Sequence, residues 1–119
     1  MEQLITISED SPTTTSIIPE NDGTLPYLKY EILISNPYCY TELEFFKEVH
    51  HVKRNKPHLK IDSYRLRRMH LPKRFGWGVH INEQKKIAII PCESAQYQKL
   101  LEDESVKKLG AYRNQKREN

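Results

Sequence analysis

The apolar positions of the chain fall into short groups, and the spacing within each group predicts several short elements rather than one long one. Gln3–Ile7 is rich in β-branched residues, which are typical of a strand. Apolar residues alternate with polar or small ones in Trp77–Asn82, and a polar turn leads to Lys86–Ile90, so these two segments are predicted to form a β-hairpin. Ser63–Met69 is less regular. We interpret it as a further strand, with a short helix as the alternative.

Two helices are predicted in the first half of the chain. Thr24 is a suitable N-cap, and Pro26 in the first turn lacks only an N–H group that a helix does not use there. This helix should end before Asn36-Pro37, because proline disfavours helical geometry in the preceding residue. A second helix begins at the capping box Thr41–Glu44 and should fade near Arg54. Its predicted apolar face consists of Phe45, Phe46, Val49 and Val52.

Two more helices are predicted near the end of the chain. Ser94 is the N-cap of the third, and Asp103–Ser105 is interpreted as the start of the fourth. The apolar residues of the fourth are Val106, Leu109 and Tyr112. Together the elements predict an α+β fold, with a small, mostly antiparallel sheet and helices packed mainly on one face. We expect a single domain over residues 1–119, in which residues 1–23 form an acidic strand plus loop and residues 114–119 a frayed basic tail.

The composition bounds the class of protein. A chain of 119 residues with 37% hydrophobic content is long enough to bury a modest core without disulfides or metal. Cys39 and Cys92 are interpreted as two separate thiols, with Cys39 packed, and no metal site or cofactor is indicated. No segment approaches the roughly eighteen apolar residues of a membrane span, and the N-terminus lacks the features of a signal peptide. The expected location is the cytoplasm.

The net charge of +3 hides a strong segregation of charge along the chain. Residues 1–24 carry five acids and no Lys or Arg, whereas residues 53–74 carry nine bases against Asp62 alone. We interpret the basic segment as the surface of a non-enzymatic binding module for an anionic partner, with nucleic acid as the leading candidate. The surface consists of Arg65, Arg67, Arg68, Lys73 and Arg74. The acidic segment folding back over these bases is an open alternative.

The basic segment ends in a glycine-framed tryptophan, Gly76-Trp77-Gly78, followed by His80. Glycines at these places allow positive φ or close backbone approach, and we interpret Trp77 as an anchor of the core. The alternative is a small-molecule or enzymatic pocket formed by Trp77, His80 and Glu93 together with Arg74. No catalytic residue is assigned, because the familiar catalytic motifs are absent. A third hypothesis is self-association through the asymmetric charges.

Three blocks of sequence carry a resemblance to a known family. They are Ile7–Pro12 followed by Pro19, Tyr30–Leu33 leading into Asn36–Thr41, and Lys73–His80, which matches the signature K-R-[YF]-G-W-G-[IV]-H. On these blocks the whole chain resembles the uncharacterised bacterial domain-of-unknown-function family 6157. The chain departs from the family at 67–70, where Arg-Arg-Met-His replaces Arg, a small residue, Ser and Pro. The resemblance implies a single domain and no known reaction.

Overall fold

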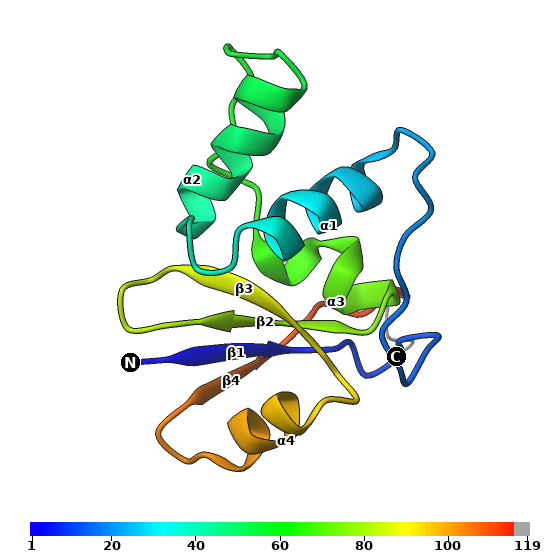
Figure 1. Ribbon diagram of the computed structural model, residues 1–119, viewed down its shortest axis with the longest axis vertical. Helices are drawn as coiled ribbons and strands as arrows, with labels where there is room; N and C mark the ends of the chain where they lie inside the picture. Colours follow the sequence, from blue (N-terminus) through cyan, green and yellow to red (C-terminus); the bar gives the residue numbers. More distant parts are fainter. Residues whose placement is uncertain (116–119) are drawn as a thin grey trace.

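The computed structural model describes residues 1–115, and its centre is a four-stranded sheet (Figure 1). The strands are β1 (Gln3–Thr6), β2 (Trp77–Ile81), β3 (Ile87–Pro91) and β4 (Lys107–Gly110), and they lie in the order β3-β2-β1-β4. β1 pairs antiparallel with β2, and β2 with β3, whereas β1 and β4 are parallel. The predicted hairpin and the predicted first strand are therefore confirmed.

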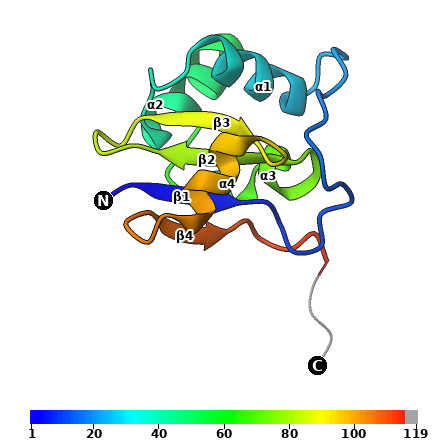
Figure 2. The ribbon, with the colours of Figure 1, turned by 60° about the horizontal axis from the view of Figure 1, so that its bottom comes forward.

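The helices cover the two faces of the sheet unequally. Their bounds are α1 Leu25–Ser35, α2 Glu42–Phe46, the π-helical continuation η1 Lys47–Lys53, the 3₁₀ turn η2 Leu66–Arg68, α3 His70–Arg74 and α4 Ala95–Glu102. Figure 2 shows α4 lying across the sheet on the side away from α1 and α2. The larger core cluster lies under the first helices and includes Phe45, Trp77 and Val79, and a smaller one unites Tyr97 of α4 with Leu4. This arrangement confirms the α+β fold with helices mainly on one face.

Two of the three predicted N-cap residues, Thr41 and Ser94, form the expected capping hydrogen bond. Thr41 accepts a hydrogen bond from the backbone N–H of Glu44, whose carboxylate accepts in return from the N–H of Thr41. Ser94 caps α4 by accepting from the N–H of Tyr97 at 3.1 Å. Thr24 precedes α1, but its hydroxyl donates to Asp22 and does not cap the helix. The first three predicted helices are thus confirmed.

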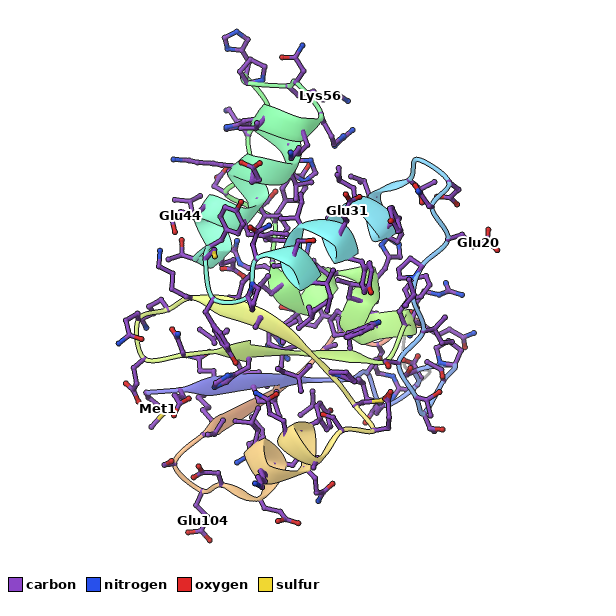
Figure 3. The ribbon with its side chains drawn as sticks, viewed as in Figure 1. Met1, Glu20, Glu31, Glu44, Lys56 and Glu104 are labelled. Carbon is purple, nitrogen blue, oxygen red and sulfur yellow. The ribbon has the colours of Figure 1, made fainter. Side chains whose placement is uncertain are left out.

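The predicted apolar face of the second helix is wrong at its end. Val52 is 60% exposed, whereas His50 is only 2% exposed. The helix widens into π geometry after Phe46, and the N–H of Arg54 donates to the carbonyl of Val49. Because a π turn holds more residues than an α turn, it rotates the following side chains out of the α-helical pattern. Figure 3 shows the resulting helical projection with Lys56 at its tip, away from the sheet.

The interpretation of Ser63–Met69 as a strand is wrong. This segment contains the 3₁₀ turn η2, and α3 begins at His70. Leu66 and Met69 are both buried, and a spacing of three residues puts both on the same side of a 3₁₀ turn. In a strand the same spacing would send them to opposite faces. The short-helix alternative therefore describes this segment.

The prediction of a fourth helix that begins at Asp103–Ser105 is also wrong, because the chain forms strand β4 over Lys107–Gly110. The N–H of Lys107 donates to the carbonyl of Glu2 at 2.9 Å, and the N–H of Ala111 donates to that of Thr6 at 3.0 Å. These hydrogen bonds satisfy the edge of β1 that β2 leaves open. Pairing with β1 therefore outweighs the helical spacing of the apolar residues.

Candidate anion-binding site

The last described segment of the chain returns to the 3₁₀ turn and places an aromatic ring between charges. The guanidinium carbons of Arg67 and Arg68 lie 4.6 and 5.4 Å from the ring centroid of Tyr112, which is 39% exposed. Arg67 Nε donates to the carbonyl of Gly110 at 2.7 Å, and its own carbonyl accepts from the N–H of Tyr112 at 2.9 Å. Strand β4 thereby fixes the ring and one guanidinium together. We call Arg67, Arg68 and Tyr112 the Arg-Tyr platform.

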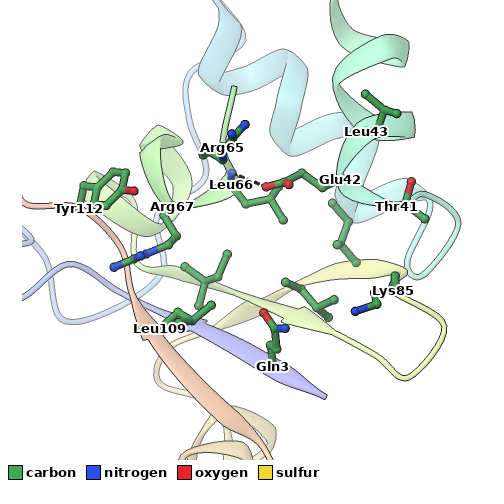
Figure 4. A pocket seen from close by; sticks show the side chains of 13 residues that line it. Gln3, Thr41, Glu42, Leu43, Arg65, Leu66, Arg67, Lys85, Leu109 and Tyr112 are labelled. Carbon is green, nitrogen blue, oxygen red and sulfur yellow. Dashed lines mark hydrogen bonds between the residues drawn. The ribbon is translucent and has the colours of Figure 1, made fainter. Parts of the chain in front are cut away.

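A groove of about 480 Å³ lies beside the platform, between the sheet and the start of α2 (Figure 4). Arg67 and Tyr112 line it together with Arg65. Lys85 reaches it from the hairpin turn, and the carboxylate of Glu42 points toward the 3₁₀ turn (Figure 4). The floor of the groove is apolar and consists of Ile5, Ile81, Ile87 and Leu109. The groove therefore combines a hydrophobic base with a charged rim.

Positive charge dominates that rim. Arg65 donates to the backbone carbonyls of Asp62 at 2.6 Å and Tyr64 at 2.9 Å, so its partners are neutral. None of the ion pairs found within residues 1–115 includes Arg65, Arg67 or an Arg68 side chain. Glu42 is the one carboxylate among the lining residues, and it accepts from the N–H of Leu66 at 3.0 Å. An anion in the groove would meet guanidinium groups that form no ion pair within residues 1–115, with Glu42 as the one carboxylate among the lining residues.

The other two predicted basic residues lie elsewhere. Arg74 lines a separate hollow with Asp10 and Arg113, and Lys73 is half-buried. The carbonyl of Lys73 accepts from the side-chain amide of Asn114 at 2.8 Å. The predicted surface of five bases is thus divided. Arg65 and Arg67 line the groove, and Arg68 lies beside them over the ring of Tyr112. Lys73 and Arg74 lie at the end of α3 and do not line the groove.

Part of the acidic N-terminal segment folds against the end of the described chain. Asp10 accepts from the N–H of Asn114 at 2.9 Å and from that of Gln115 at 3.1 Å, and Glu9 forms an ion pair with Arg113. These hydrogen bonds hold the pKa of Asp10 well below its usual range. Residues 116–119 of the predicted basic tail lie outside the described part of the chain. The acids therefore meet residues 113–115, and the ring of Tyr112 stays with its two arginines.

The glycine-framed tryptophan is a docking point for the N-terminal loop. Trp77 is 5% exposed, and its indole N–H donates to the carbonyl of Ile17 at 2.8 Å. Gly76 has φ of +76°, and a Cβ there would lie 2.2 Å from the carbonyl oxygen of Thr15. Gly78 faces the other side of the sheet, where a Cβ would lie 2.4 Å from the ring of Tyr97. Both glycines thus permit close packing, and the interpretation of Trp77 as a core anchor is confirmed.

His80 and Glu93, the other residues of the alternative pocket, have separate structural partners. His80 is buried between the Tyr38 hydroxyl, 2.7 Å from Nδ1, and the Glu2 carboxylate, 2.7 Å from Nε2. Burial raises the pKa of Tyr38. Glu93 accepts from the hydroxyl of Ser16 at 2.5 Å and from its N–H at 2.9 Å, and these hydrogen bonds lower the pKa of its carboxyl group. The structure does not bring Trp77, His80 and Glu93 together with Arg74 around one cavity.

No cysteine or histidine is among the described residues that line the groove. Cys39 is exposed, so its interpretation as packed is wrong, while Cys92 is half-buried and both are free thiols. Burial and the neighbouring carboxylate of Glu93 raise the pKa of Cys92. Within residues 1–115 no group of three or more His, Cys, Asp or Glu side chains could hold a metal ion. No helix in the same residues is long and apolar enough to cross a membrane.

Sequence reasoning missed Tyr112 as a site residue, because it assigned this tyrosine to the apolar face of a helix. The sequence feature that could have indicated its role is its position directly before Arg113, with Lys116 and Arg117 shortly after. A tyrosine inside a basic segment is typical of surfaces that combine charge with stacking. Its approach to Arg67 and Arg68, more than forty positions earlier, depends on β4 pairing with β1.

The three blocks that carry the family resemblance meet in space. Asp10 and Pro12 of the first block line one hollow with Arg74 of the third, and the contact of Tyr38 with His80 joins the second block to the third. Neither the curated proteins nor the solved structures contain a match to this chain. The model of the family described as "Family of unknown function (DUF6157)" matches residues 1–117. With nearly the whole chain matched, the protein belongs to this family of unknown function.

Proposed function

We propose that the protein is a binding module for an anionic partner, and that this partner is single-stranded nucleic acid. The observation that carries the proposal is the Arg-Tyr platform at the mouth of an apolar-floored groove. Arg65 adds a third guanidinium at the same groove. The surface therefore offers charge for phosphates and apolar area for bases within one small region.

Each part of the surface suits a different part of a nucleotide strand. Guanidinium groups bind phosphate oxygens through charge-assisted hydrogen bonds, and among the described residues these arginines form no ion pair with a carboxylate. The Tyr112 ring and the planes of its two arginines can stack on bases. A base of a single strand is free to enter a groove, whereas a base of a duplex stays paired. This difference favours single strands over duplexes.

The same contacts favour binding over the alternative of an enzymatic pocket. Trp77, His80 and Glu93 each hold another segment of the chain in place, namely Ile17, Tyr38 with Glu2, and Ser16. Side chains engaged in this way serve the fold. The arginines of the groove, by contrast, direct their charge to neutral carbonyls and a ring.

Fluorescence anisotropy with a labelled single-stranded RNA of roughly twelve nucleotides tests the proposal. The affinity should fall linearly with salt on logarithmic axes, because binding releases counterions. Arg67→Gln and Tyr112→Ala should each weaken binding by about tenfold, the loss of one phosphate contact or one stacked base. Lys99→Gln on α4 removes one exposed charge from the opposite side of the sheet and should leave the affinity unchanged.

Two results would overturn the proposal. One is an affinity that Arg67→Gln and Tyr112→Ala leave unchanged while both variants remain folded by circular dichroism. The other is a concentration-dependent mass in sedimentation without RNA that Arg67→Gln abolishes, since this would assign the surface to self-association. A duplex of the same sequence should bind more weakly than the single strand.

A further inference from the structure

A second, smaller hollow lies next to the groove. Its volume is about 210 Å³, and Arg65 lines both cavities. Arg68, which belongs to the Arg-Tyr platform, also lines the smaller hollow. The full lining consists of Lys29, Phe46, Ser63, Tyr64, Arg65, Arg68 and Met69. It holds three cations and no carboxylate, so the hollow is more strongly positive than the groove.

Lys29 is the unusual member of this lining. It projects from α1 and is half-buried, with Nζ 5.6 Å from the ring centroid of Phe46. None of the ion pairs within the described residues includes it. Burial, together with the charge of Arg54, lowers the pKa of Lys29 to about 8. A half-buried ammonium without a carboxylate is costly, and a bound anion would offset that cost.

The charged side chains around Lys29 are also positive, and they affect the pKa values of two nearby histidines. The pKa of His50 is lowered to about 4 by burial and by the charges of Lys29 and Arg54. Burial and the charge of Lys29 also lower the pKa of His70. These effects show that the field of Lys29 reaches two neighbouring histidines, which stay neutral at pH 7. The hollow is thus lined by three cationic side chains, and none of its described lining residues is a carboxylate.

We propose that this hollow is a phosphate site that takes the terminal phosphate monoester of the bound strand. The inference rests on the proposed function. A terminal phosphate presents three free oxygens, which match three cationic donors, whereas a phosphate inside a strand presents only two. The hollow has less than half the volume of the groove, which suits a phosphate group better than a base. A free small phosphate ester carries the same chemistry and is the other source of ligand.

Binding of two otherwise identical RNA strands, one with a 5′-phosphate and one with a 5′-hydroxyl, tests the inference, with a 3′-phosphorylated strand as a third arm. A terminal phosphate at the end that the hollow accepts should tighten binding by about tenfold. Lys29→Met should remove this advantage and leave the affinity for the hydroxyl-ended strand within about twofold. Lys99→Met, on the opposite side of the sheet, should preserve the full advantage.

Inorganic phosphate and glycerol phosphate separate this inference from the proposed function. If no RNA binds but either phosphate stabilises the wild type and not Lys29→Met in thermal melting, the hollow is a site for free esters. The phosphate site then stands and the proposed function fails. If RNA binds through Arg67 and Tyr112 with no preference for phosphorylated ends, and neither phosphate has an effect that depends on Lys29, the inference fails alone.

A measurement on the wild type covers the case in which Lys29→Met does not fold. The NMR signal of the Lys29 side chain should titrate at a higher pH when inorganic phosphate is added, because a bound anion favours the ammonium form. A titration of Lys29 that inorganic phosphate leaves unchanged would overturn the site.

Discussion

Two regions of this molecule use polar side chains in opposite ways. In the segment from Gly76 to His80, the polar groups are buried and partnered, as the indole N–H of Trp77 and both ring nitrogens of His80 show. In the Arg-Tyr platform, Arg67 and Arg68 contact a neutral carbonyl and an exposed ring. The first region holds chain segments together, and the second leaves charge available for a partner.

The comparison shows that a conspicuous sequence motif can serve close packing. Close packing demands particular residues, because only glycine tolerates the positive φ and the near contact at Gly76. A surface for anions demands charge and access, and several arrangements of Arg and Lys satisfy both. Such a surface leaves a weaker pattern in the sequence than a packed turn does.

The largest effect that would sharpen this comparison is expected for Gly76→Ala. The added Cβ would collide with the backbone of Thr15, and the alanine would have to adopt a positive φ. We therefore expect a loss of roughly 3–5 kcal/mol in the free energy of unfolding. Gly23→Ala is the matched control, because Gly23 has φ of +79° and open space around it. It should cost only about 1 kcal/mol. Equal losses in urea denaturation would contradict the docking role of Gly76.

Tyr38→Phe should have the next largest effect. It removes the partner of Nδ1 of the buried His80, and we expect a loss of about 1–3 kcal/mol in the free energy of unfolding. Tyr27→Phe is the control, since Tyr27 packs through its ring on Tyr30. Thermal and urea denaturation measure both. If Tyr38→Phe were neutral for stability but changed ligand binding, His80 would belong with the functional region and the comparison would break.

Sulfate binding should depend on pH through Lys29. The pKa of Lys29 is lowered to about 8, so its ammonium is present at pH 7 and mostly lost at pH 9, and we expect sulfate affinity to fall by about threefold to tenfold between them. Sulfate keeps a constant charge over this range, unlike phosphate. The charged and titratable groups near Lys29 are His50, Arg54, Tyr64, Arg65, Arg68 and His70. Calorimetric titration of Lys29→Met should show no such fall, and a fall that persists would assign the effect to another group.

The smallest effect on stability is expected for Arg68→Gln. Arg68 is exposed and its guanidinium lies over the ring of Tyr112, so the free energy of unfolding should change by less than about 0.5 kcal/mol. RNA affinity should nevertheless fall severalfold. A large destabilisation without loss of binding would place Arg68 in the structural region.

The fold was predictable where local chemistry decides it. The capping box at Thr41, the cap at Ser94 and the hairpin from Trp77 are each specified by residues close in sequence. The candidate site was predictable in part: Arg65, Arg67 and Arg68 were recognised as basic, but their ring partner was not. Lys73 and Arg74 are separated from these three arginines because they belong to helix α3. The interpretation of Ser63–Met69 as a strand did not predict this helix.

The sequence by itself determined the α+β class, the caps at Thr41 and Ser94 and the segregation of charge, because each depends on residues close together along the chain. Tertiary structure alone decided that β4 pairs with β1, that the helix after Phe46 widens, and that Tyr112 meets Arg67. The open edge of β1 needs hydrogen-bond partners, and a distant segment supplies them at the expense of its own helical spacing. The Arg-Tyr platform, the surface proposed to bind anions, arises from that long-range pairing.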